Sequence, residues 1–130
     1  MKIFSKIMIF LVGVVHVMFF KLESLDLKNP DVMLKFGLDD QSVVHVAPWA
    51  FNQGFYNLFL ALGLFYSLFL YYRNKKVQAD TLASFILATI VGAAAVLHFS
   101  IDGKLAAALV QGAPAFLGFV SICFINDQKS

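Results

Sequence analysis

The sequence places a few polar side chains inside long apolar stretches. His16 precedes Glu23 by seven residues, so a helix would carry both on one face, two turns apart. The stretch "WAFNQGFYNLFLALGLF" brings three amides, Asn52, Gln53 and Asn57, to the start of an otherwise apolar segment. A carboxylate, an imidazole and several amides could bind a small ligand, transfer a proton or help to hold a metal.

The composition indicates where these side chains must lie. Of the 130 residues, 60% are hydrophobic and only 14% are charged, whereas a soluble domain carries about a quarter charged residues. Fifteen Phe are too many for one small soluble core, so the surplus must face lipid. The single Cys123 leaves no intramolecular disulfide framework and no zinc pattern, and a net charge of +2 gives no footprint for nucleic acid. We therefore predict an integral membrane protein with one domain over residues 1–130.

Four apolar segments are long enough to cross about 30 Å of hydrocarbon. They run over about residues 3–22, 54–72, 81–100 and 105–125. The first is interpreted as a retained anchor, because no small-residue cleavage pattern follows it. The predicted fold is an all-α membrane protein, a four-transmembrane-helix bundle with a short helical extracytoplasmic segment between the first two spans.

The connection between the first two spans carries helix signals. Asn29 followed by Pro30 is typical of a helix start, and Gly37 of its end. Asp39 or Asp40 could cap the next helix, which Pro48 would start or kink.

The charged residues predict the orientation. One side of the membrane would hold Lys2, Lys6, Arg73, Lys75, Lys76 and Lys129, and the other would hold Lys21, Lys28, Lys35 and Lys104. Because Lys and Arg favour the cytoplasmic side, both termini are predicted to be cytoplasmic.

This topology brings the polar side chains to a common depth. His16, Glu23, Asn52, Gln53, Asn57, His98 and Gln111 all fall in the outer half of the bilayer or at its outer edge. Polar groups in hydrocarbon normally face the bundle interior, so an outward-facing polar pocket is predicted. The competing interpretation is that the same side chains only hydrogen-bond helices together, while His98 is solvated.

Small residues in the third and fourth spans indicate close helix contacts, with the Phe-rich flanks of the first two spans facing lipid. The glycines expected at such contacts are Gly13, Gly63, Gly92, Gly112 and Gly118.

Four blocks, "VVHVMFFKLES", "FGL", "FNQGFYNLFLALGL" and "VQGAPAFLGF", resemble the DUF1304 family of small bacterial membrane proteins over about residues 13–119. The resemblance implies a four-helix inner-membrane protein with no established activity. It singles out His16, Glu23, Asn52, Gln53, Gly54, Tyr56, Asn57, Gln111, Gly112 and Pro114. Family members tend to carry Met and Trp shortly after the glutamate, whereas this chain has Ser24 and Asp26.

The favoured hypothesis is a membrane protein that binds a small polar or amphiphilic ligand, with transport requiring a homo-oligomer. The predicted ligand-binding residues are His16, Glu23, Asn52, Gln53, Tyr56, Asn57 and Gln111, while the sequence leaves the cofactor and any catalytic residues open. One alternative is a haem or metal protein that uses His16 and His98, with Glu23 as a further metal ligand. Others are an enzyme acting on a lipid or quinone with Glu23 and His16 as acid and base, although no catalytic motif supports it, and a structural or regulatory membrane subunit.

Overall fold

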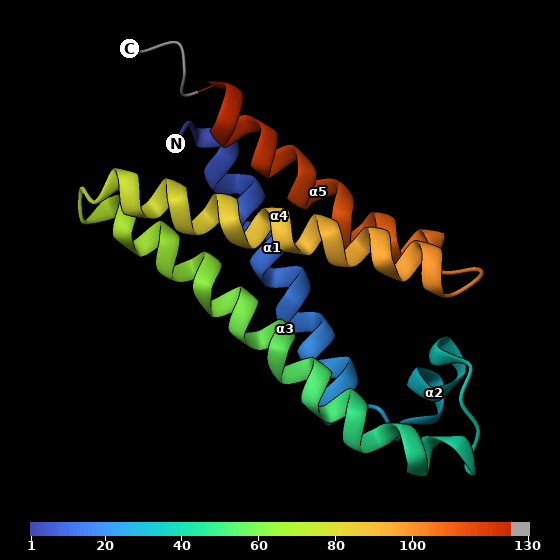
Figure 1. The fold of residues 1–130 in the computed structure, drawn as a ribbon. Coiled ribbons are helices and arrows are strands. Elements are labelled where there is room, and N and C mark those ends of the chain that lie inside the picture. The colour runs from blue at the N-terminus through green and yellow to red at the C-terminus, as the bar shows by residue number, and fades with distance from the viewer. Residues whose placement is uncertain (126–130) are drawn as a thin grey trace.

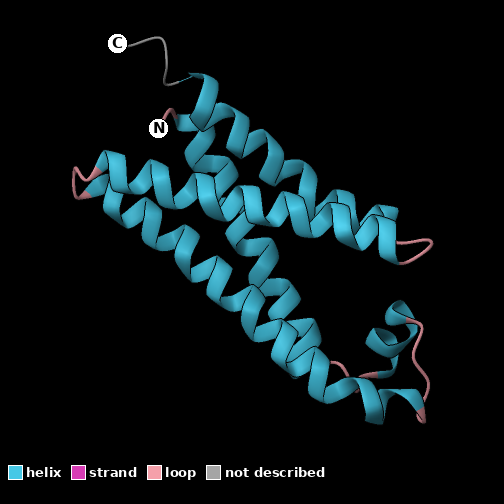
Figure 2. Ribbon diagram, viewed as in Figure 1, coloured by secondary structure: helices cyan, strands magenta, loops and turns pink. Residues whose placement is uncertain are grey.

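The computed structural model describes residues 1–125, and this part of the chain contains helices and loops but no strand (Figures 1 and 2). The elements in chain order are α1 (Ile3–Phe20), the π-helical turn η1 (Lys21–Leu25), α2 (Pro30–Phe36), α3 (Ser42–Tyr72), α4 (Lys76–Ser100) and α5 (Leu105–Ile125). Four helical segments are long and apolar enough to cross a membrane: Ile3–Leu25, Ser42–Tyr72, Lys76–Ser100 and Leu105–Phe124. The predicted all-α membrane fold with four spans is confirmed.

Two helices extend beyond the apolar segments that predicted them. α3 begins at Ser42, near the start that a cap at Asp39 or Asp40 predicts and well before the apolar span from about residue 54. α4 begins at Lys76, before the apolar span from about residue 81. Hydropathy marks only the part of a helix that fits the hydrocarbon, whereas backbone hydrogen bonds continue into polar turns. Pro48 therefore lies inside α3, near its start. The backbone hydrogen bond that proline cannot donate is thus lost close to the helix end, where it disturbs few turns.

The predicted signals around α2 are confirmed by its hydrogen bonds. The Asn29 side-chain oxygen accepts from the backbone N–H of Asp31 at 3.0 Å, and proline takes the first helical position. Gly37 ends the helix in the left-handed region with φ of 71°. The Asp39 carboxylate accepts from the backbone N–H of Ser42 at 2.7 Å, so this aspartate supports the start of α3.

The main core is aliphatic and lies where the four long helices meet. α1 packs against α3 and α5, and α4 packs against the same two helices. The buried core side chains are Ile9, Val12, Leu64, Ala83, Ile86, Leu87, Ile90, Ala115 and Ile122. No Phe is buried in the described residues, although all fifteen lie within them. The aromatic side chains therefore cover the outside, as expected for a surface that meets lipid.

Contacts between distant parts of the sequence define one end of the helix assembly. The Met1 ammonium lies 3.7 Å from the Asp80 carboxylate, which joins the chain start to the first turns of α4. Ser121 donates a hydrogen bond to Ser5 at 2.9 Å, so the end of α5 lies beside the start of α1 (Figure 1). We call this the terminal end. Lys129, which the charge argument used, lies outside the described residues.

At the other end, which we call the distal end, the helices separate into two pairs. Figure 1 shows α3 and α4 running apart from the turn that joins them, with α2 beside the start of α3. α2 adds a small second core, formed by Leu27, Met33 and Val43.

Four of the five predicted glycine contacts are confirmed. A Cβ at Gly112 would lie 2.7 Å from the Ala94 side chain, and one at Gly63 would lie 2.5 Å from Ile86. A Cβ at Gly13 would likewise lie against the Phe65 side chain, and one at Gly118 against Leu87 and Met8. The prediction for Gly92 is wrong, because nothing lies within 4 Å of a Cβ there. Gly92 is exposed on α4.

Candidate functional site

The candidate site is built on the π-helical turn that follows α1. The backbone N–H of Asp26 donates to the Lys21 carbonyl at 2.9 Å, the i to i−5 spacing of a π-helix. Such single turns widen the helix locally and recur at functional sites. Here the turn holds Glu23 and Ser24, and both contact α3.

Glu23 is held by one amide of α3. The Asn57 side-chain N–H donates to Glu23 Oε2 at 2.8 Å, and no other described group hydrogen-bonds this carboxylate. Asn57 is 6% exposed, whereas Glu23 is half-buried. The amide therefore fixes one carboxylate oxygen while the side chain keeps access to the surface. A bond from an uncharged donor to a carboxylate is stronger than a neutral pair.

Ser24 and Gly54 set how closely the turn approaches α3. The Ser24 hydroxyl donates to the Phe51 carbonyl at 2.9 Å. A Cβ at Gly54 would collide with that hydroxyl and lie 3.2 Å from the Phe20 carbonyl oxygen. Glycine is therefore required by this close approach. The sequence analysis noted Ser24 only as a departure from the family pattern, because a serine at a helix end gives no sign of a partner far along the chain.

His16 lies in the core below the turn. It is 0% exposed, its Nδ1 donates to the Val12 carbonyl at 2.9 Å, and its ring contacts Phe19 edge-on with centroids 5.8 Å apart. Nε2 has no hydrogen-bond partner in the described structure. The His16 side chain is thus shielded from the surface of the described structure.

A pocket of about 270 Å³ lies beside Glu23. Its lining residues are Glu23, Ser24, Leu25, Leu27, Lys28, Ala47 and Phe51. One carboxylate and one ammonium thus share a small pocket with apolar walls, supplied by the turn, the segment after it and the first turns of α3. Lys21, at the start of the turn, pairs with Asp26.

The structure does not gather all the predicted ligand-binding residues at this pocket. Only Glu23 lines it, and Asn57 supports Glu23 from behind. The other three predicted residues of α3, Asn52, Gln53 and Tyr56, are exposed and lie outside the lining. Gln111 is half-buried on α5 and His98 is exposed near the end of α4, both outside the lining. Shared depth therefore predicted which side chains lie near the distal end but not which ones meet.

The arrangement gives no support to the three-ligand metal site considered from the sequence. No three His, Cys, Asp or Glu side chains in the part of the chain that the structure describes come together as a candidate metal site. His16, one of the two imidazoles considered for a haem, is buried, whereas His98 is exposed.

The comparisons with known proteins identify the family. Residues 10–123 match the model of a family described as "Protein of unknown function (DUF1304)", and the chain therefore belongs to that family. The match includes η1 and α3, which build the site. No curated protein and no solved structure matches the chain with significance.

Proposed function

We propose that this DUF1304 membrane protein binds a small polar or amphiphilic ligand at the Glu23 pocket. We further propose that it lies in the bacterial inner membrane with both termini cytoplasmic, so that the distal end and its pocket face outward. The excess of Lys and Arg near the terminal end supports this orientation.

The half-buried Glu23 carboxylate is the observation that carries the proposal. A carboxylate at this depth is costly unless it is paired, and Asn57 satisfies only one of its oxygens. A purely structural contact could be made with an uncharged side chain at lower cost. The placement of Glu23 on a π-helical turn, at the wall of a pocket, supports a role in binding.

The lining indicates the chemistry of the ligand. Glu23 would accept hydrogen bonds from an ammonium or another donor, and Lys28 would face an anionic or acceptor group. Leu25, Leu27 and Phe51 supply apolar contact for the rest of the molecule. The best match is an amine-bearing amphiphile, such as the head group of a zwitterionic lipid that carries a primary amine.

The experiment compares two short-chain lipids with identical acyl chains, phosphatidylethanolamine, which carries a primary amine, and phosphatidylcholine, which does not. Binding of each to the full-length protein in mild detergent would be titrated by native mass spectrometry. We expect the wild type to prefer phosphatidylethanolamine. Glu23→Gln should lower the affinity for that lipid by about tenfold, because a hydrogen bond between charged groups is lost.

Asp102→Asn is the matched control, since it removes one exposed carboxylate from the α4–α5 turn, at the same end but outside the pocket. It should leave the phosphatidylethanolamine affinity unchanged. Equal affinities for the two lipids, or an unchanged affinity in Glu23→Gln, would overturn the proposal and leave the Glu23–Asn57 contact as a helix-pairing bond.

A further inference from the structure

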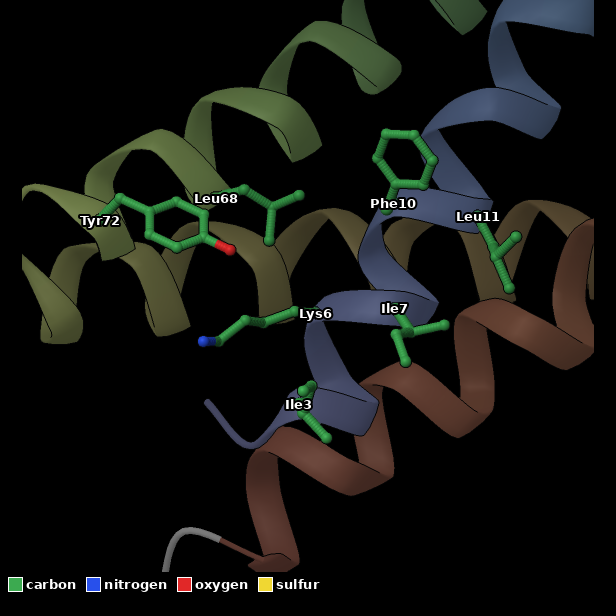
Figure 3. A pocket seen from close by; sticks show the side chains of 7 residues that line it. All are labelled: Ile3, Lys6, Ile7, Phe10, Leu11, Leu68 and Tyr72. Carbon is green, nitrogen blue, oxygen red and sulfur yellow. The ribbon is translucent and has the colours of Figure 1, made fainter.

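A second pocket lies at the terminal end, outside everything used for the Glu23 site. Its volume is about 440 Å³, and it is a groove between the start of α1 and the end of α3 (Figure 3). It is lined by Ile3, Lys6, Ile7, Phe10, Leu11, Leu68 and Tyr72. Apart from one ammonium and one phenol, the lining is apolar.

Lys6 lies at the polar end of this groove. Its Nζ is 4.2 Å from the centroid of the Tyr71 ring and 5.4 Å from that of Tyr72. Figure 3 shows the ammonium beneath the Tyr72 ring, while the apolar side chains of α1 continue along the groove away from it. The two aromatic rings hold the lysine head beside the groove by cation–π attraction and do not neutralise its charge. An anion could therefore still bind there.

Two further basic residues are adjacent in sequence to residues that line the groove. Lys2 precedes Ile3 and Arg73 follows Tyr72, and both basic side chains are exposed. The wall formed by Ile7, Phe10 and Leu11 is partly exposed and lies within a span that is apolar enough to cross the membrane. A positive head region above an apolar channel is complementary to an anionic lipid with its acyl chain lying along the helix.

We propose that this groove is a binding site for an anionic phospholipid. The lipid phosphate accepts hydrogen bonds from the Lys6 ammonium and the Tyr72 hydroxyl, and one acyl chain lies against Ile7, Phe10 and Leu11. The site is independent of the Glu23 pocket, which lies at the distal end and favours an amine.

The test measures binding of dioleoyl phosphatidylglycerol and dioleoyl phosphatidylcholine to the full-length protein by native mass spectrometry. Phosphatidylglycerol should bind more tightly, and Lys6→Gln should weaken it by about fivefold, the factor that corresponds to one basic residue at an anionic lipid surface. Lys76→Gln is the matched control, because it removes an equal charge from the exposed start of α4, outside the groove. It should weaken binding much less.

A second variant tests the acyl-chain contact without changing charge. Ile7→Trp fills the groove and should lower the affinity for both lipids. Phe85→Trp, on an exposed face of α4 outside the groove, should leave both affinities unchanged. Helicity measured by circular dichroism verifies that each variant is folded.

Equal losses in Lys6→Gln and Lys76→Gln would reduce the site to general attraction at a basic surface and overturn the proposal. Equal affinity for the two lipids, or no effect of Ile7→Trp, would also overturn it. Phosphatidylglycerol binding should persist in Glu23→Gln, which separates this test from that of the proposed function.

Discussion

The two ends of the helix assembly are held together in different ways. From the terminal end to the middle of the assembly, α1, α3, α4 and α5 meet around aliphatic side chains such as Leu64, Leu87 and Ile90. At the distal end, α1 and α3 remain paired through polar contacts from the π-helical turn, including Glu23–Asn57. The main core thus consists of aliphatic packing, whereas the distal contact depends on hydrogen bonds between particular side chains. Ionisable side chains within a membrane protein are costly and mark functional sites, so the polar pairing is the better guide to function.

The largest expected change in the free energy of unfolding comes from a substitution in the aliphatic core. Leu64 is 0% exposed and Leu62, on another face of α3, is 53% exposed. Leu64→Ala should lower the free energy of unfolding by about 2–5 kcal/mol, because it leaves a cavity among four helices. Leu62→Ala should change it by less than about 0.5 kcal/mol. Denaturant titration in detergent micelles measures both, and equal losses would show that the main core is placed wrongly.

The next effect concerns the close approach of the turn to α3. Gly54→Ala should destabilise the protein by about 1–3 kcal/mol, because the new methyl group overpacks the contact with Ser24 and the Phe20 carbonyl. Gly92→Ala is the matched control, since nothing lies within 4 Å of its Cβ. It should be neutral or stabilising by up to about 1 kcal/mol, the difference in helix propensity. The same unfolding titration decides, and a reversed order would contradict the described contact.

A smaller effect isolates the polar pair. In a double-mutant cycle of Glu23→Ala and Asn57→Ala, the coupling energy should be about 0.6–2 kcal/mol, as for other hydrogen bonds between membrane helices. A parallel double-mutant cycle of Glu23→Ala and Asn52→Ala, at an exposed amide, should give a coupling energy near zero. Coupling energies of similar size in both cycles would mean that Glu23 does not interact specifically with Asn57.

The smallest effect is at the start of α3, outside the apolar spans. Hydrogen bonds from the Ser42 side chain and backbone lower the pKa of the Asp39 carboxyl from its usual 3.8. Because the folded-state pKa is depressed, the stabilisation is present above the unfolded value and is lost as the pH falls through the folded value.

NMR titration of the Asp39 carboxyl should therefore give a midpoint below 3.8 in the wild type. Ser42→Ala should move that midpoint upward, since it removes the side-chain donor. Identical midpoints in the two proteins would show that the Ser42 hydroxyl does not stabilise the carboxylate.

The four spans and the small capped helix could be predicted from the sequence. A run of about 20 apolar residues is sufficient to mark a membrane helix, because the bilayer imposes its thickness on any such segment. Asn29, Pro30 and Gly37 act through contacts with their immediate neighbours, so their effect is also visible in the sequence.

Which polar residues meet depends on how the helices pack, and the sequence did not predict it. Asn52, Gln53 and Asn57 are alike in sequence terms, but the direction of α3 buries Asn57 and exposes the other two. In a soluble helix, the apolar stripe would have shown the buried face. Here lipid-facing and core-facing sides are both apolar, so periodicity carries little information. The π-helical turn adds a local rotation that no composition rule foresees, and that turn brings Glu23 to Asn57 and Ser24 to Gly54.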